Sequence, residues 1–152
     1  MKVEDVHEML FNPDWRPSHT VGMAPVPGIT SQLKADSTIP YVKEETMVLD
    51  LRDEESFDKS HLPGSLNLPV DFEDDLNPFT HMEIMIRQFR LLDSQLSPAF
   101  CKLFAGRKLL VLSHRGHMGR LAMSILRNRS VKAHCIIGGS EKWRKTGLWG
   151  HW

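Results

Sequence analysis

The sequence predicts an α/β domain of three layers, with a mostly parallel central sheet covered by helices on both faces. Short apolar runs that are typical of buried strands recur along the chain. Segments with helical spacing of apolar residues separate these runs. Gly, Pro, Asn and Ser gather in the connections between them. This alternation of strand and helix favours parallel strands side by side in one sheet.

The N-terminal part of the chain divides into a short helix and a long irregular segment. Apolar residues at Val3, Val6, Met9 and Leu10 share one helical face, which predicts a helix there. Residues 12–45 contain five prolines with scattered Gly, Ser and Thr, so we expect a long irregular excursion. A connection of this length is unusual inside a compact domain.

Regular structure is predicted to resume with a strand at 47–51, a short helix at 54–59 and a turn and strand at 61–69. Asn77 and Pro78 predict the start of a longer helix, with Asn as N-cap and Pro at the first helical position. Apolar residues then recur at steps of three and four, which predicts that this helix packs one face on the sheet. These residues are Met82, Met85, Ile86, Phe89 and Leu92.

The second half of the chain repeats the alternation. Pro98 breaks the long helix, and a further helical piece is expected to run to Gly106, a typical C-terminal stop. The elements expected after it are a strand at 108–112, a helix at 121–126, a strand at 131–137, a Gly-Gly turn and a short helix at 140–145.

Length and charge narrow the classes of function. The 152 residues fit one domain, expected to span 1–152 with its core at about 47–147. Lys plus Arg and Asp plus Glu number 19 each, so no global charge attracts nucleic acid or an acidic membrane. No run reaches the roughly 18 to 20 apolar residues that span a bilayer. The first residues do not resemble a secretory signal, so we expect a cytoplasmic or other intracellular protein.

One segment combines a favourable position with suitable chemistry for ligand binding. It follows the strand predicted at 108–112, and ligands of open α/β sheets bind outside the carboxyl ends of strands. Its glycines let the backbone curl, and successive N–H groups near a helix start can cradle an anion. A polar connection with its basic residues in water is the alternative. The candidate anion- or partner-binding residues are Ser113, His114, Arg115, Gly116, His117, Met118, Gly119 and Arg120.

Three blocks of sequence carry a resemblance to a known family. Residues 48–57 read VLDLRDEESF, an apolar strand followed by Asp-x-Arg and an acidic helix. Residues 61–69 read HLPGSLNLP, and residues 135–143 read CIIGGSEKW. Together, in this order, they resemble the rhodanese-like domain family, which includes sulfurtransferases and the Cdc25-like phosphatases. The resemblance covers roughly 47–147 and implies the rhodanese-like three-layer fold.

The loop of that family carries a reactive cysteine in a Cys-x-x-Gly-x-Arg pattern. Placing Ser113 on the cysteine sets Gly116 on the glycine, puts Met118 where many members carry Arg, and matches the length of the sulfurtransferase loop. A second placement resembles the longer loop of Cdc25-like phosphatases, with His114 on the nucleophile position and Arg120 as the terminal arginine. Neither placement supplies a thiol.

The resemblance and the missing thiol together predict a catalytically inactive domain that serves as a protein-interaction or regulatory module, within a larger protein. Both family reactions need a thiolate, and a serine hydroxyl cannot carry a persulfide. Serine attacks phosphate only with a base beside it, for which His114 and His117 are candidates. An active sulfurtransferase or Cdc25-like phosphatase with an unusual loop, and an anion sensor, remain alternatives. We expect no catalytic residue and no cofactor.

Other reactive side chains have simpler interpretations. Cys101 is expected to pack in a helix, and Cys135 to be a buried strand residue. The His114 and His117 spacing can bind zinc, but no further pair completes the ligand set, so no metal is expected.

We expect the charged and aromatic residues outside this segment to have structural or surface roles. The resemblance implies that Asp50 and Arg52 form a structural polar pair. Trp143 matches a packing position. For Trp149 and Trp152 we expect contact with neighbouring sequence, with cover of the bottom of the core as the alternative. An acidic cluster is predicted to be a solvated surface, with docking of a basic partner as the alternative. It consists of Asp71, Glu73, Asp74 and Asp75.

Overall fold

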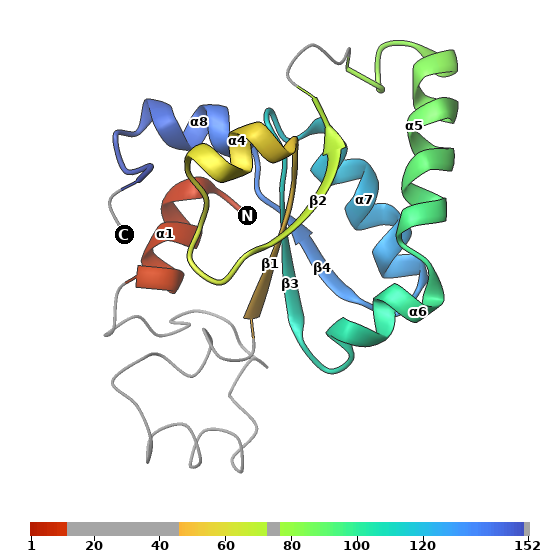
Figure 1. The fold of residues 1–152 in the computed structure, drawn as a ribbon, viewed down its shortest axis with the longest axis horizontal. Coiled ribbons are helices and arrows are strands. Elements are labelled where there is room, and N and C mark those ends of the chain that lie inside the picture. The colour runs from red at the N-terminus through yellow and green to blue at the C-terminus, as the bar shows by residue number, and fades with distance from the viewer. Residues whose placement is uncertain (12–45, 73–76, 151–152) are drawn as a thin grey trace.

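A parallel sheet forms the centre of the molecule, as the sequence predicts (Figure 1). The computed structural model describes residues 1–11, 46–72 and 77–150, so the excursion predicted for 12–45 lies outside the described residues. Four described strands pair in parallel in the order β2-β1-β3-β4. They are β1 (Thr46–Arg52), β2 (Leu66–Asp71), β3 (Lys108–Leu112) and β4 (Lys132–Cys135).

Helices cover both faces of this sheet, which confirms the α/β fold (Figure 1). On one side lie α1 (Val3–Phe11), α4 (Glu54–Lys59) and α8 (Gly139–Lys145). On the other lie α5 (Met82–Gln95), α6 (Pro98–Cys101), the 3-10 turn η1 (Lys102–Phe104) and α7 (His117–Asn128). None of the helices in the described ranges has the length and apolar character needed to cross a membrane.

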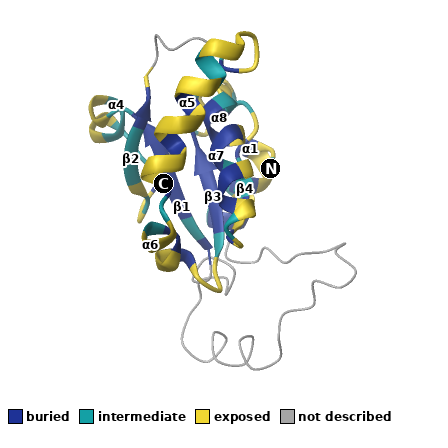
Figure 2. Ribbon diagram, turned by 90° about the vertical axis from the view of Figure 1, so that its right-hand side faces the viewer, coloured by how far each residue is buried: buried dark blue, intermediate teal, exposed yellow. Residues whose placement is uncertain are grey.

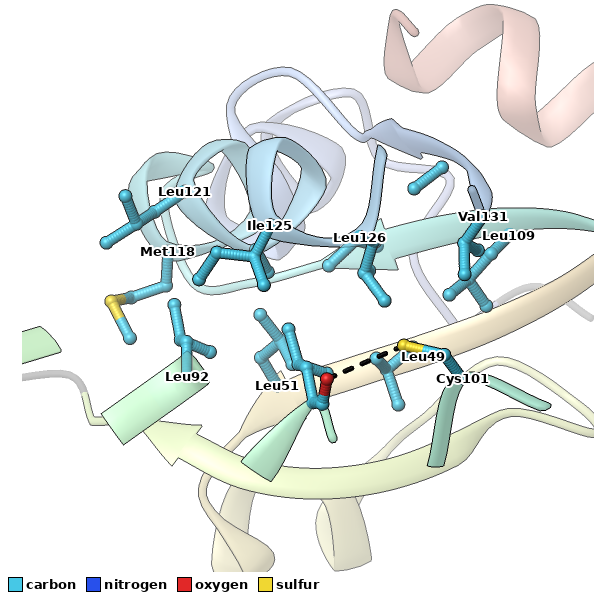
Figure 3. Close-up of a cluster of buried hydrophobic side chains, with 14 of the residues drawn as sticks. Leu49, Leu51, Leu92, Cys101, Leu109, Met118, Leu121, Ile125, Leu126 and Val131 are labelled. Carbon is cyan, nitrogen blue, oxygen red and sulfur yellow. Dashed lines mark hydrogen bonds between the residues drawn. The ribbon is translucent and has the colours of Figure 1, made fainter. Parts of the chain in front are cut away.

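The strands bury both of their faces, which explains why they read as continuous apolar runs. Along β3, Leu109 and Val111 contribute to the core beneath α5, α6 and α7 (Figure 3). Leu110 and Leu112 point the other way, into a second core with α1 and the fully buried Trp143 of α8. The period of two in a strand therefore distributes one apolar run between two cores.

A buried ion pair holds the end of β1. The Nη2 of Arg52 donates to Asp50 Oδ2 at 2.9 Å and to the Ser60 carbonyl at 2.7 Å, and both charged side chains are fully buried. The side-chain amide of Asn67 donates to the main-chain carbonyls of Asp50 and Arg52 at 3.0 and 2.8 Å. These bonds fix β2 and the turn after α4 against β1, which is the structural role expected of Asp50 and Arg52.

Helix α5 begins later than the sequence predicts. The Asn77 side chain accepts the Phe79 N–H at 2.9 Å and closes a turn, and the helix starts at Met82 with His81 as N-cap. The expected start at Asn77 and Pro78 is therefore wrong by about one helical turn. An Asx-type turn uses the same side-chain oxygen as an N-cap, so the two cannot be separated by sequence.

The face of α5 that packs inward also differs from the prediction. Leu92 is buried as expected, but Gln88 is the other buried residue of this helix. Met82, Ile86 and Phe89, which were expected against the sheet, are exposed. Helical periodicity identifies an apolar face without saying what covers it, and here the inward face lies to one side of the apolar row.

Removing Asp50 should destabilise the fold strongly. Asp50→Ala leaves the Arg52 guanidinium buried without its counter-charge, and we expect a loss of about 3 to 5 kcal/mol in the free energy of unfolding, measured with urea. Glu55→Ala is the control, because its pair with Lys59 is exposed and spans 3.3 Å on α4. That change should stay within about 0.5 kcal/mol. Equal effects of the two substitutions would contradict this role for Asp50.

Candidate functional site

The predicted binding segment lies at the carboxyl end of β3, but only its first half is a loop. The strand ends at Leu112, residues 113–116 form the connection, and α7 begins at His117 rather than at 121. Gly116 is the N-cap with a φ of 94°, a left-handed conformation that favours glycine. The last four predicted site residues therefore form the first turn of a helix. The sequence did not predict this turn, because it begins with polar residues and a glycine.

The hydroxyl of Ser113 lies at the centre of this turn. Its Oγ accepts the N–H of Gly116 at 3.0 Å and the N–H of Gly119 at 3.1 Å, and the residue is fully buried. A Cβ on Gly119 would lie 3.2 Å from this Oγ, so a larger residue would crowd the hydroxyl. Donors arranged in this way stabilise negative charge on the atom that they reach. The structure thus brings Ser113, Gly116 and Gly119 together as one N–H cradle with an oxygen at its focus.

The start of helix α8 is hydrogen-bonded to the main chain of the cradle. The N–H of Ser140 donates to the Ser113 carbonyl and the N–H of Glu141 to the His114 carbonyl, each at 2.9 Å. Gly139 has a φ of 62°, and a Cβ there would lie 2.2 Å from the Ser113 carbonyl oxygen. Because this contact is with backbone, it has no flexible side chain to relieve it. The Gly-Gly turn is therefore required by the close approach of two backbones.

His114 is buried, which is contrary to the alternative of a polar connection with its basic residues in water. Its Nε2 lies 2.8 Å from Asp53 Oδ1, and its main-chain N–H donates to Asp71 Oδ2 at 2.7 Å. A carboxylate only accepts hydrogen bonds, so Nε2 carries the hydrogen in this pair. Asp53 follows a different strand and lies 61 residues from His114 in the sequence, so local sequence pattern does not predict this pair.

The two carboxylates around His114 have different roles. Asp53 caps α4 by accepting the Ser56 N–H at 3.1 Å. Burial raises the pKa of Asp53, but hydrogen bonds from His114 and Ser56 outweigh burial and leave that pKa below its ordinary value. Asp71 is buried, so its assignment to a solvated acidic cluster is wrong. The rest of that cluster, residues 73–75, lies outside the described residues.

The His114 imidazole is joined to Asp53 and not to the Ser113 hydroxyl in the part of the chain that the structure describes. Its Nε2 is engaged by Asp53, and within the described ranges no hydrogen bond joins the ring to the Ser113 hydroxyl. A serine nucleophile needs a base within hydrogen-bond reach. The arrangement therefore orders the loop without forming a Ser-His-Asp triad.

The remaining predicted site residues point in different directions. Arg115 pairs with Glu141 of α8 at 2.9 Å, and both side chains are about half exposed. The guanidinium of Arg120 lies 4.6 Å from the centre of the Phe79 ring, before α5. Met118 is buried in the core beneath α7 (Figure 3), and His117 is partly buried. The structure does not gather these side chains around one point.

The two cysteines lie outside the cradle. Cys101 is buried in the core, as expected, and burial raises the pKa of its thiol. Cys135 is only partly buried, which corrects the expectation of a buried strand residue. Its Cβ lies 3.6 Å from where a Cβ on Gly119 would be, so this thiol borders the turn.

Groups that could hold a metal or ligand are few in the part of the chain that the structure describes. No cluster of three or more His, Cys, Asp or Glu there is placed to bind a metal ion. One pocket lies between α4 with its flanking residues and the C-terminal part of α8 with the segment after it. It is lined by Asp53, Glu55, Ser56, Lys59, Ser60, Arg144 and Trp149.

The parallel sheet and the N–H cradle after β3 define an open α/β domain with a cradle at the carboxyl edge of its sheet, which is the edge where ligands of such sheets bind. Residues 33–146 match the family model of the rhodanese-like domain. The chain therefore belongs to the rhodanese-like domain family, as its motifs predict.

Solved structures give more distant likenesses. A human single-domain sulfurtransferase is 21% identical, with a TM-score of 0.42, 79% of this chain covered and 92% of that chain. A rhodanese-related protein from Thermoplasma volcanium is 17% identical, with a TM-score of 0.44 and coverages of 68% and 81%. The N-terminal domain of a putative ATP/GTP binding protein from Clostridium difficile is 15% identical, with a TM-score of 0.48 and coverages of 68% and 90%. No curated protein matches the chain in sequence.

Gly139→Ala should destabilise the protein more than Gly64→Ala does. Both positions have positive φ, so both substitutions cost about 1 to 2 kcal/mol for the left-handed backbone. Only at Gly139 does the new methyl group meet backbone, whereas a Cβ at Gly64 meets nothing within 4 Å. Urea unfolding of the two variants measures the difference. Equal losses would show that the contact between α8 and the loop is not tight.

Lowering the pH should destabilise the native protein more than it destabilises the Asp53→Asn variant. The pKa of Asp53 is lowered in the folded state from an ordinary value of 3.8, so its contribution to stability is present above that value and is lost as pH falls through the folded pKa. Asparagine keeps the N-cap but does not titrate. Urea unfolding at a series of pH values should show the stability gap between the two proteins closing below about pH 4. A gap that does not change with pH would contradict the assignment.

Proposed function

We propose that this protein is a rhodanese-like domain without sulfur-transfer activity, which acts as a protein-interaction or regulatory module. One observation carries the proposal. The buried Ser113 hydroxyl accepts the N–H groups of Gly116 and Gly119 at the carboxyl end of β3, where the family resemblance expects the reactive cysteine. The fold and the cradle of the family are retained, and the sulfur is replaced by oxygen.

The chemistry of the two atoms differs at this position. Backbone donors lower the pKa of a thiol and produce the thiolate that accepts a transferred sulfur atom. A serine hydroxyl stays protonated at neutral pH unless a base removes its proton, and an oxygen does not hold a sulfane sulfur. Because His114 is engaged by Asp53, no such base is supplied from the neighbouring residue. These features support an inactive cradle.

The exposed side chains at the carboxyl edge of the sheet suit an interaction role. Within this segment the side chains of Arg115 and Arg120 are exposed. An acidic group of a partner, or a small anion, is the complement of this edge. We propose this edge, residues 113–120, as part of the binding surface of an intracellular single domain.

Sulfur transfer through Cys135, or phosphatase chemistry of the Cdc25-like type, is the competing function. The position of Cys135 favours the first of these, because its partly buried side chain borders Gly119. In that reaction a thiolate attacks the outer sulfur of thiosulfate, the S–S bond breaks and sulfite leaves with the electron pair. Cyanide then takes the sulfur from the persulfide as thiocyanate and returns the thiolate.

Incubation of the native chain with thiosulfate and cyanide should give no thiocyanate above the background without protein. Ser113→Cys should take up one sulfur atom from thiosulfate, because the two N–H donors then face a thiol. Intact mass spectrometry measures this addition, with Cys101→Ser as the matched control. Thiocyanate formed by the native chain and lost in Cys135→Ser would overturn the proposal.

A further inference from the structure

Basic side chains gather where β3 and β4 begin, at the opposite end of β3 from Ser113. Lys108 opens β3 and is the direct register partner of Lys132, which opens β4. Register partners in adjacent strands place their side chains on the same face of a sheet, and the strands are about 4.8 Å apart. The same pairing sets His134 beside Leu110, two residues further along each strand. The three basic side chains therefore share one face of the sheet.

These side chains lie at an edge of the sheet. Among the described strands β4 pairs only with β3, and Figure 2 shows it beside the buried strands β1 and β3. Lys132 is exposed, and Lys108 and His134 are partly buried. From the last turn of α7, Arg127 reaches the same edge: its Nε donates to the Ala133 carbonyl at 2.8 Å and its Nη2 to His134 Nδ1 at 3.4 Å. Lys108, Arg127, Lys132 and His134 together form the β4 basic cluster.

No acid balances the β4 basic cluster in the part of the chain that the structure describes. None of the ion pairs there includes a member of the cluster. Other basic residues near the surface do have acidic partners, such as Arg115 with Glu141 and Arg129 with Asp93. Cations that lie together without a counter-charge create a positive potential that attracts an anion from outside the chain.

The pKa shifts within the cluster have the direction expected of cations that repel one another. Burial, and then the charge of Lys132, lower the pKa of Lys108. Burial is also the largest cause that lowers the pKa of His134. The charges of Lys108, Arg127 and the Met1 ammonium act on His134 in the same direction. An anion bound among these groups would oppose the electrostatic part of both shifts, because it favours the protonated forms.

The arrangement suits an anion with more than one charge. A carboxylate carries a single negative charge, whereas a phosphate monoester carries about −1.5 to −2 at neutral pH and has three acceptor oxygens. Two lysines paired across adjacent strands, with a guanidinium at the neighbouring histidine, match the phosphate better. Beside the histidine the cluster holds two lysines and one arginine, so a phosphate leaves about one positive charge, which an adjacent carboxylate can pair with.

We propose that the β4 basic cluster docks a phosphorylated side chain of a partner protein that has an acidic residue beside it. The chain as a whole has no excess of positive charge, which disfavours nucleic acid or an acidic membrane as the occupant. This inference rests on the proposed role as an interaction module. It names the chemistry of the partner and a surface separate from residues 113–120.

A phosphopeptide tests the proposal with the intact chain. The probe is a capped Gly and Ala peptide with one phosphoserine followed by one Glu, and its binding is followed by amide shifts in NMR spectra of the isotope-labelled protein. We expect saturable binding that weakens as salt is raised, because salt screens charges at the surface. The same peptide with unmodified Ser should bind about tenfold more weakly or not at all, because it keeps only one charge. Equal binding of the two peptides would overturn the proposal.

Charge reversal locates the binding. Lys132→Glu changes the exposed lysine of the cluster and should weaken binding about tenfold or more. Lys102→Glu is the matched control, because Lys102 of η1 is exposed and has no ion pair within the described ranges. The control should change the affinity by less than about twofold, since its charge lies outside the cluster. Unchanged affinity of Lys132→Glu would place the binding elsewhere and end the proposal.

The histidine of the cluster gives a second readout. At constant pH the ring resonances of His134 should move toward those of the protonated form as the phosphopeptide binds, because a neighbouring anion raises the pKa of the imidazole. The ring of His61, which contacts the Phe57 carbonyl after α4, should not respond. Equal responses of the two rings, or none at His134, would contradict the assignment.

Two further measurements test the other occupants. Inorganic phosphate should bind more weakly than the phosphopeptide, because it lacks the adjacent carboxylate, and equal affinity would assign the cluster to free phosphate and overturn the proposal. Binding to vesicles of phosphatidylcholine and phosphatidylserine, without binding to the phosphopeptide, would assign it to a membrane instead. Thiocyanate formation by the native chain would overturn the inactive function alone, because it reports on the cradle at the other end of β3.

Discussion

The turn after β3 and the first residues of α8 pack main chain against main chain at the site. The carbonyls of Ser113 and His114 accept N–H groups of Ser140 and Glu141, and Gly139 leaves room for this contact only because it has no side chain. Main-chain carbonyls that are buried need such partners. The turn after β3 therefore takes its shape from a helix that follows a different strand. With the turn fixed, the Ser113 side chain is directed to the N–H groups that open α7.

The proposed function depends on a single atom at the focus of that turn. Backbone donors that would stabilise a thiolate instead hold the hydroxyl of Ser113 as an acceptor. Backbone N–H groups can donate to sulfur as well as to oxygen, so the donors themselves do not distinguish the two atoms. Acidity and the ability to carry sulfur do distinguish them. The proposed inactive function rests on this difference.

The polar residues near the site are largely used to hold the structure. Asp53 joins His114 to α4, and Arg115 pairs with Glu141 of α8. At the end of β1 the guanidinium of Arg52 is buried against Asp50. Buried charges of this kind are tolerated only when they are paired, so each pair also fixes the elements that supply it. The apolar row on α5 contrasts with these pairs, since it is exposed and α5 is anchored without it.

The sequence by itself determined the strands, their alternation with helices and the family. Apolar runs such as Lys108–Leu112 are set by nearby residues, so local pattern is enough to find them. It also located the segment that begins at Ser113 at the end of a strand. Sequence did not find the partnership of His114 with Asp53, or that Asp71 is buried. Nor did it assign the apolar row of α5 to the surface. Each of these depends on which distant elements meet, and only the tertiary structure brings residues from separate strands and helices within contact distance.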